Sequence, residues 1–217
     1  MNIYLYFLLF LIYSLIGWLI EVVNVSFIEK RFVNRGFLMG PYCPIYGVGG
    51  ILCYLFLRKY LDDPIALFMM SILIFSLLEY MTSFIMEKLF KARWWDYSNK
   101  RFNINGRICL ETMVPFGLLG CFAMYVMNPF FIGLLEKIPS NVAMIISIIL
   151  FVLFIIDCCI SFKIIINFKN VAFSIKKDST EEITKKVREK LTKESVLTRR
   201  LINAFSKFQV IRKKKDK

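Results

Sequence analysis

Residues 138–156 read IPSNVAMIISIILFVLFII, a continuous run without a charged side chain. A helix needs about 20 mainly apolar residues to cross the hydrocarbon core of a bilayer, so this run is long enough to span a membrane. Two further charge-free runs of similar length lie at 1–20 and 36–57. Because 58% of the 217 residues are hydrophobic, the composition excludes an ordinary soluble enzyme and predicts a membrane protein.

The hydrophobicity pattern predicts an all-α, polytopic membrane domain with five transmembrane helices. The apolar runs are continuous rather than alternating, which favours helices over a barrel. The expected spans are 3–25, 41–57, 64–86, 108–131 and 139–162. The first run lacks a basic leader and a small-residue cleavage site, so we expect a retained span rather than a signal peptide. The membrane domain then covers 1–165, and a basic cytoplasmic tail covers 166–217.

Basic residues are distributed unevenly among the loops. Successive loops contain three, two, six and one Lys+Arg, and the segment from residue 163 onward contains 17 of the 29 in the chain. Loops rich in Lys and Arg remain on the cytoplasmic side of a membrane. This predicts a multi-pass protein of the bacterial inner (cell) membrane with its N-terminus outside and its C-terminus in the cytoplasm.

The sequence contains a candidate internal repeat. A shift of 58 residues aligns the pattern E-x7-E-K-x-F, which begins at Glu21, with the same pattern beginning at Glu79. A further insertion of about 13 residues brings Pro44 onto Pro115 and Gly49 onto Gly120. We therefore expect two parallel two-helix repeats, at about 1–57 and 64–131, followed by one further helix.

Glycines and prolines predict an interrupted start to the second helix of each repeat. From Pro44 to Leu57 there are 14 residues, about 21 Å of helix against a hydrocarbon core of ~30 Å. Residues 36–43 should therefore form a broken or re-entrant entry. Irregular backbone at membrane depth points to a binding site, whereas the alternative is that these residues only allow close helix packing.

Four acidic side chains fall inside or at the edge of the expected spans, namely Glu21, Glu79, Glu111 and Asp157. Ionisable groups are unfavourable against lipid, so we expect them to face the protein interior. Arg107 precedes Glu111 by one helical turn and can pair with it, and Arg35 and Arg93 are further candidate partners. The pattern indicates a cytoplasm-facing polar cavity that binds a substrate or cation or exchanges protons. Structural ion pairing is the open alternative.

Residues 91–107 read KARWWDYSNKRFNINGR and place Trp94 and Trp95 beside Arg93 and Asp96. We favour an aromatic belt at the membrane interface as the explanation of these tryptophans. The alternative is contact with a substrate or a lipid headgroup, through a tryptophan stacked on a cation or through Arg93 on a phosphate.

The tail is predicted to form a basic amphipathic helix after a capping box at Ser179 and Glu182. Attraction to anionic lipids is its expected role, with a helix-groove partner as the alternative, and we do not expect nucleic acid as a partner. The chain has no histidine, and its six cysteines show no C-x-x-C spacing. We therefore expect neither a metal site nor a cofactor.

Several strings resemble a family of bacterial membrane proteins known as putative ABC-transporter type IV, or putative ABC transporter permease. They are GWLIE (17–21), NRGFLMGPYCPIYG (34–47), EKLFKARWWDYS (87–98) and FNINGRICLE (102–111). The resemblance covers about residues 7–130 and implies a permease driven by a separate ATPase subunit. The family often carries Trp-Gly where this chain has Phe116-Gly117.

The chain itself has no G-x-x-x-x-G-K-[ST] phosphate loop, so through that motif it cannot power transport. Five spans are few for a transport pathway, which favours a homodimer or a complex. We therefore expect a transporter component rather than an enzyme. Two alternatives stay open. One is an intramembrane enzyme for a lipid-linked substrate, using Glu79 and Glu111 as acid and base and Arg93 and Arg107 as phosphate ligands. The other is a regulatory or scaffold protein that acts through its tail.

Overall fold

The computed structural model describes residues 1–174, 180–194, 196–205 and 208–210. Four of its helices are long and apolar enough to cross a membrane, namely Ile3–Glu29 (α1), Pro64–Phe90 (α3), Leu110–Leu135 and Ser140–Ile164. They confirm the helical membrane protein expected from the sequence. The third is composed of α4 (Leu110–Phe122), a π-helical turn (Ala123–Met127) and α5 (Asn128–Leu135).

The second expected span is too short to count as a membrane crossing. α2 (Pro44–Phe56) has 13 residues, about 20 Å of helix. It begins at Pro44, because the fixed φ of proline suits the first helical turn. The preceding residues 31–43 contain no helix. The interruption expected at 36–43 is therefore confirmed, whereas the count of five spans stays a prediction.

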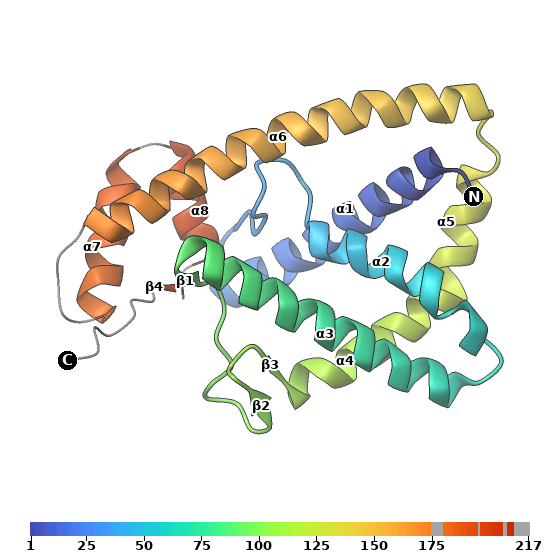
Figure 1. The fold of residues 1–217 in the computed structure, drawn as a ribbon, viewed down its shortest axis with the longest axis horizontal. Helices are drawn as coiled ribbons and strands as arrows, with labels where there is room; N and C mark the ends of the chain where they lie inside the picture. Colours follow the sequence, from blue (N-terminus) through green and yellow to red (C-terminus); the bar gives the residue numbers. More distant parts are fainter. Residues whose placement is uncertain (175–179, 195, 206–207, 211–217) are drawn as a thin grey trace.

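The helices form one bundle with the tail at one end (Figure 1). α1, α2, α3 and α6 (Ser140–Ser174) run along its length. The N-terminus and α5 lie at one end, and the tail helices α7 (Thr180–Glu194) and α8 (Val196–Ala204) lie at the other. We call the latter the tail end. α6 continues to Ser174 as one helix, beyond the domain boundary expected at 165.

Two of the long helices that reach the tail end, α1 and α3, stop in the same way. α1 and α3 each contain 27 residues, and each is followed by a lysine in the left-handed conformation, Lys30 at φ 51° and Lys91 at φ 55°. A cation at this position is favourable because the C-terminus of a helix carries partial negative charge. The start of α3 is fixed by Asp63, whose carboxylate accepts hydrogen bonds from the amides of Ile65 and Ala66.

Short β-pairs organise the loops at the tail end. β2 (Asn103–Ile104) pairs with β3 (Ile108–Cys109) in a hairpin that projects sideways from the bundle (Figure 1). β1 (Ala92–Arg93), which directly follows α3, pairs antiparallel with β4 (Gln209–Val210) of the tail, and Ala92 lies opposite Val210. The tail is thus joined to the membrane helices through backbone hydrogen bonds.

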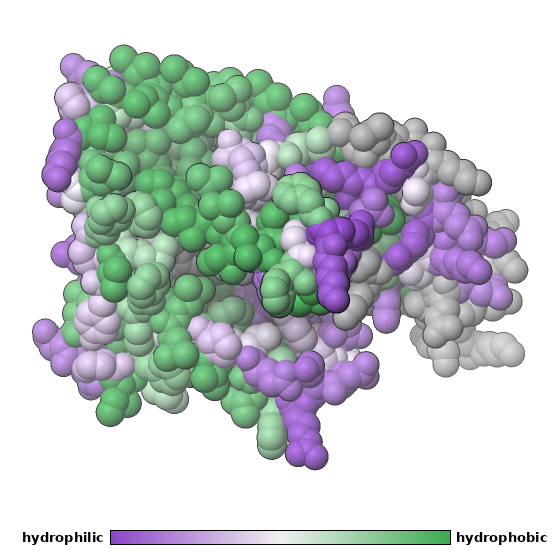
Figure 2. Space-filling view, turned by 180° about the vertical axis from the view of Figure 1, so that it is seen from behind, coloured by the Kyte–Doolittle hydropathy of each residue, from purple (hydrophilic) through white to green (hydrophobic). Residues whose placement is uncertain are grey.

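The tail helices are amphipathic as predicted, but their apolar face is covered by the protein. Its side chains are buried against Phe90 and Trp94 in one core; they are Ile183, Val187, Leu201, Phe205 and Phe208. The predicted capping residue Ser179 lies outside the described residues. Figure 2 shows hydrophobic residues over the bundle and hydrophilic residues gathered towards the tail end. In this arrangement the tail's apolar face is not available to lipid.

Glycines allow close approach within each pair of neighbouring helices. In the first pair, a Cβ on Gly47 would overlap Phe10 and Ser14, and a Cβ on Gly50 would overlap the ring of Tyr13. In the second pair, a Cβ on Gly117 would overlap Phe68, and one on Gly120 would overlap Ser71. Phe68 and Ser71 follow Phe10 and Tyr13 by 58 positions, the shift of the candidate repeat.

We predict that Gly120→Ala destabilises the protein by about 1–3 kcal/mol, because the new methyl group overlaps Ser71 in a packed interface. Gly133→Ala is the matched control, since no atom lies within 4 Å of a Cβ built there. Thermal unfolding in detergent measures both variants. Equal melting temperatures for the two would contradict the assigned helix contact.

Candidate functional site

Glu21 and Glu79 each accept a hydrogen bond from a tyrosine at the tail-end half of the bundle. Tyr46 at the start of α2 donates to Oε1 of Glu21 on α1 at 2.9 Å. Tyr97, in the loop after β1, donates to Oε1 of Glu79 on α3 at 3.2 Å. Burial is the largest cause of the raised pKa of Tyr97; the charge of Glu79 adds to it, and that of Glu21 has a smaller effect. The phenol therefore remains a donor. Both acids thus act on one tyrosine.

Glu79 is the most enclosed of the four predicted acids. It is 9% exposed, and its Oε2 atom is buried without a hydrogen-bond partner among the described residues. Ser76, one helical turn earlier on the same face of α3, is 5% exposed, and its hydroxyl also has no partner there. Buried polar atoms are nearly always hydrogen-bonded in native proteins. Both atoms are therefore available to a further hydrogen-bond partner.

Glu21 differs from Glu79 because it has a cationic neighbour. Arg35 Nε lies 3.6 Å from Oε2 of Glu21, and both side chains are partly exposed. The same guanidinium donates to the backbone carbonyl of Ala204 and lies over the ring of Phe205, 4.5 Å from its centroid. Arg35 therefore links Glu21, one of the two acids Glu21 and Glu79 that we call the acid pair, to the end of α8. No ion pair to Glu79 occurs among the described residues.

A second charged group is built around Glu87, which the sequence-based site did not include. Its Oε2 atom accepts a hydrogen bond from Nε of Arg93 at 3.0 Å and forms an ion pair with Arg107, also at 3.0 Å. Arg107 is 7% exposed and also donates to the hydroxyl of Ser83 at 3.1 Å. Its guanidinium stacks against Tyr80 and Phe84. Glu87 is the second glutamate of the repeat pattern E-x7-E-K-x-F. Its position at the end of an expected span was the available signal, since a glutamate there needs a cationic partner.

The expected pair of Arg107 with Glu111 is wrong. Residues 108–109 form the extended strand β3, so no helical turn connects the two side chains. Glu111 instead lies in the first turn of α4 with a 60% exposed side chain and pairs with Lys100 at 2.7 Å. A carboxylate suits that position, because the N-terminus of a helix carries partial positive charge. Glu111 is therefore a surface residue and not an interior acid.

Asp157 holds the irregular segment that precedes α2. Its Oδ1 and Oδ2 atoms accept the backbone N–H groups of Met39 at 2.8 Å and Gly40 at 2.7 Å. Ser161, one turn further along α6, donates to the same carboxylate at 3.0 Å. From the tail, Arg200 donates to the carbonyl of Leu38 at 2.7 Å. Asp157 thus accepts backbone N–H groups of a non-helical segment, and the amide of Met39 also donates to the hydroxyl of Ser161 at 3.1 Å.

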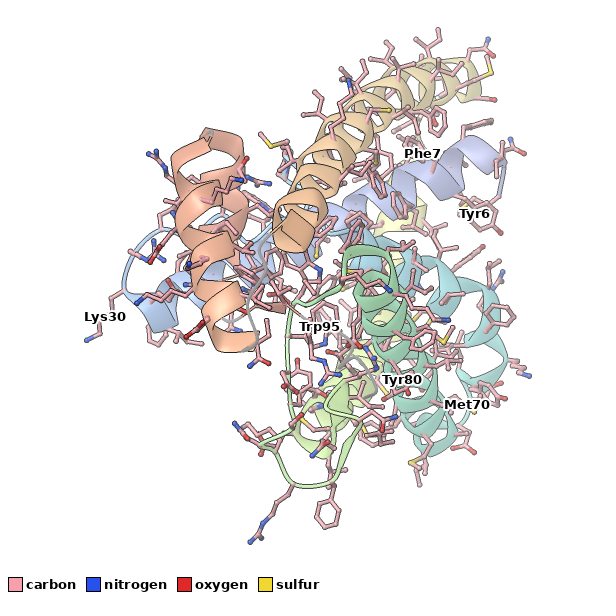
Figure 3. The ribbon with its side chains drawn as sticks, turned by 60° about the vertical axis from the view of Figure 1, so that its left-hand side comes forward. Tyr6, Phe7, Lys30, Met70, Tyr80 and Trp95 are labelled. Atoms are coloured by element: carbon pink, nitrogen blue, oxygen red, sulfur yellow. The ribbon has the colours of Figure 1, made fainter. Side chains whose placement is uncertain are left out.

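The aromatic pair in the loop after α3 has an interior position. Trp94 is 3% exposed and packs edge-on against Phe37 and Phe205, so it cannot belong to an aromatic belt against lipid. Trp95 donates to the carbonyl of Arg107 at 3.3 Å. Figure 3 shows Trp95 and Tyr80 surrounded by other side chains, whereas Lys30 points away from the protein. These tryptophans hold loops together.

Asp96 organises the turn that carries Tyr97. It accepts the amide and the hydroxyl of Ser98 and lies 3.4 Å from Arg93. Burial opposes ionisation, but the bonds from Ser98 and the charge of Arg93 hold the pKa of Asp96 below its usual value. Gly106 faces this turn at φ +66°, where a Cβ would overlap Asp96 and Ser98. Asp96 is therefore a positioning residue for the loop.

Two hollows lie away from the acid pair. One, of about 380 Å³, is lined by Tyr4 and by residues 135–140 at the end opposite the tail. The other, of about 560 Å³, lies between α1 and α6 and is lined by residues such as Phe7, Ser147 and Phe151. Neither hollow is lined by Glu21 or Glu79, so neither corresponds to the polar cavity expected from the sequence. Among the described residues, no three His, Cys, Asp or Glu side chains come together.

A buried polar contact that the sequence reading missed connects α1 with α5. Tyr13 donates to Oδ1 of Asn128 at 2.7 Å, and Asn128 donates to the sulfur of Met124 at 3.1 Å. Asn128 directly follows the π-helical turn, which rotates its amide into the bundle. A single amide within an apolar run was the available signal.

We predict that Glu87→Gln lowers the free energy of unfolding by about 3–5 kcal/mol, because it leaves the buried Arg107 without its anionic partner. Glu111→Gln is the matched control and should change it by less than about 1 kcal/mol, since that pair is exposed. Denaturation in detergent measures both. A larger loss for Glu111→Gln would contradict the assigned pairing.

A family model described as "Putative ABC-transporter type IV" matches residues 8–162. The match extends beyond the resemblance seen at 7–130 and includes most of the last apolar helix with Asp157. No curated protein and no solved structure matches the chain.

Proposed function

Because the chain belongs to the putative ABC-transporter type IV family, we propose that it is the membrane-embedded permease subunit of a transporter. Family membership and the apolar helices support a membrane transporter component. The energy source is a separate ATPase subunit, since the sequence contains no phosphate-loop motif. A second copy of the chain in the assembly would provide enough helices for a pathway.

The buried carboxylate of Glu79 is the observation that carries this proposal. Within the described part of the chain, its Oε2 atom has no hydrogen-bond partner, as is also true of the hydroxyl of Ser76 one helical turn away, and it has a tyrosine donor but no cationic partner. A purely structural acid inside a bundle is expected to be fully bonded or ion-paired. Glu79 is therefore the group that binds the transported substrate or exchanges a proton or cation during the cycle, and Glu21 with Arg35 is its charged neighbour.

The repeat places this site between two related helix pairs. We retain the repeats at 1–57 and 64–131, supported by glycine contacts in both pairs, in which Gly47 meets Phe10 and Gly117 meets Phe68, 58 positions later; the two glycines themselves lie 70 positions apart, one fewer than in the alignment of Pro44 with Pro115. Glu21 and Glu79 are the equivalent acids of the two pairs. Rocking of one pair against the other would change the surroundings of both carboxylates and give each side of the membrane access in turn.

The enzyme alternative is less well supported. It requires Arg93 and Arg107 to hold a phosphate, yet both guanidinium groups already bind Glu87. It also requires Glu111 to act as an acid or a base inside the bundle, and this side chain is exposed. The scaffold alternative gives no role to Oε2 of Glu79 and the hydroxyl of Ser76, which have no hydrogen-bond partner among the described residues.

We propose that the tail end faces the cytoplasm, with the N-terminus outside and residues 166–217 as a basic cytoplasmic segment beside the inner leaflet. The Lys+Arg count of the loops supports this orientation. A reporter enzyme fused after Lys217 should be active in the cytoplasm, and the same reporter fused before Met1 should be active outside. Activity of the C-terminal fusion on the outside would reverse the orientation.

Affinity purification from the native membrane in mild detergent tests the permease assignment. We expect an ATPase subunit to be recovered in stoichiometric amount with the tagged chain. Recovery of the chain alone under conditions that preserve its folded state would contradict the assignment.

In the recovered complex, Glu79→Gln should lower ATP turnover by about 5- to 100-fold, the size of a typical coupling between sites. The amount of assembled complex should stay unchanged, because Glu79 has no ion pair to lose among the described residues. Glu111→Gln is the control and should leave turnover unchanged, since that acid is exposed. Normal turnover in Glu79→Gln would remove Glu79 from the mechanism.

A further inference from the structure

The tail is held to the membrane helices by a reciprocal pair of arginine contacts. Arg35, from the segment between α1 and α2, donates to the carbonyl of Ala204, the last residue of α8. Arg200, from α8, donates to the carbonyl of Leu38 in that same segment. Each partner thus caps a backbone carbonyl of the other. Together with the β1–β4 pairing, these contacts place the tail directly over residues 35–40.

The docked tail leaves Arg200 incompletely bonded. Its Nε and NH1 atoms are buried without hydrogen-bond partners among the described residues. The charge of Asp157 acts on it, but the carboxylate of Asp157 already accepts from Met39, Gly40 and Ser161. Unbonded buried donors are unfavourable, and more so on a charged group. A phosphate group would satisfy the guanidinium, since its oxygens match the planar fork of arginine.

The outer side of the tail is basic. Lys185, Lys186 and Lys190 on α7 and Arg199 on α8 are exposed, against the exposed acids Glu182 and Glu189. The segment from residue 163 holds 17 Lys+Arg and 6 Asp+Glu, so its net charge is strongly positive. The candidate span of α6 ends at Ile164, and the same helix continues towards the tail. The tail therefore begins at the membrane surface, within reach of lipid headgroups.

The apolar face of the tail is complementary to a membrane as well as to the loops it now covers. Its buried side chains Ile183, Val187, Leu201 and Phe205 form one side of two amphipathic helices with a basic opposite side. This is the composition of helices that lie in the headgroup region of an anionic leaflet. The same face can therefore pack against the loops, as the structure shows, or against the headgroup region of a membrane.

We propose that the tail is a lid that anionic lipid releases, with its apolar face exchanging from the loops around Leu38 and Trp94 to the inner leaflet. Phosphate groups then bind Arg200, and lipid covers the apolar face. Release separates Arg35 from Ala204 and leaves it with Glu21 alone. It also uncovers β1 and residues 38–40, two of whose amides donate to Asp157. This inference goes beyond the permease assignment and does not depend on an ATPase.

A disulfide across the β1–β4 pair tests the lid directly. The full chain, with its six native cysteines replaced by serine or alanine, carries Ala92→Cys and Val210→Cys, which are direct cross-strand partners. It is placed in nanodiscs of phosphatidylcholine with or without phosphatidylglycerol and oxidised for a fixed time. We expect the crosslinked fraction to fall at least about threefold with the anionic lipid, because several basic residues gain contact with it.

The matched control is a crosslink within the β2–β3 hairpin, between Asn103→Cys and the native Cys109, with the other five cysteines replaced. This crosslink should form equally in both lipids. A fall in both crosslinks would indicate a general effect of lipid on oxidation and would overturn the inference, as would an unchanged Ala92→Cys/Val210→Cys crosslink. Loss of that crosslink only on addition of a partner protein would assign the surface to the protein and overturn the role of lipid.

A second measurement uses the unmodified chain, so it is independent of whether the cysteine variants fold. Hydrogen exchange of the peptides that contain Ala92 and Val210 should accelerate in anionic nanodiscs, whereas the β2–β3 peptide should not change. Arg200→Gln should reduce this acceleration, since the variant no longer has unbonded guanidinium donors to relieve. Equal exchange in both lipids would overturn the inference.

Discussion

The backbone segment between α1 and α2 is not helical, so its N–H and C=O groups have no partners within a helix. The rest of the structure depends on which other groups bond them. Asp157 accepts the N–H groups of Met39 and Gly40, and Arg200 donates to the carbonyl of Leu38. Within a bilayer such groups have no water to bind, so each missing bond is unfavourable by several kcal/mol. One carboxylate on α6 and one guanidinium on α8 therefore allow an irregular segment inside the bundle.

The position of this segment determines the charged site. It carries Arg35, which lies beside Glu21 and caps α8 through Ala204. Among the described residues Tyr97 is the one hydrogen-bond donor to Glu79 on α3, so the two acids that the proposed repeat aligns have different surroundings. That asymmetry gives Glu21 a cationic neighbour in Arg35 and is the basis of the proposal that Glu79 binds a ligand or a proton. A transporter component needs such a responsive group, whereas a passive anchor does not.

Sequence reasoning located the interruption before Pro44 and the interior acids Glu21 and Glu79, because both follow from local composition. It misplaced the partner of Arg107, since helical spacing was extended across residues 108–109, which form a strand. Trp94 and the apolar side of the tail were assigned to lipid, yet they cover each other. A one-dimensional pattern indicates that a face is apolar but not which surface covers it. Tyr46 and Tyr97 were missed because their link to the acids depends on tertiary contact.

Amide hydrogen exchange at Met39 and Gly40 tests most directly the claim that Asp157 holds the interrupted segment. Both amides should exchange at least about 100-fold more slowly than the amide of Phe32 in the same segment. Each donates a hydrogen bond, and that bond must open before the amide can exchange. In Asp157→Ala this protection should be lost at Gly40 and reduced at Met39, whose amide also donates to the hydroxyl of Ser161 at 3.1 Å. Equal exchange rates at Met39, Gly40 and Phe32 in the unmodified protein would contradict the account, and so would full protection in the variant.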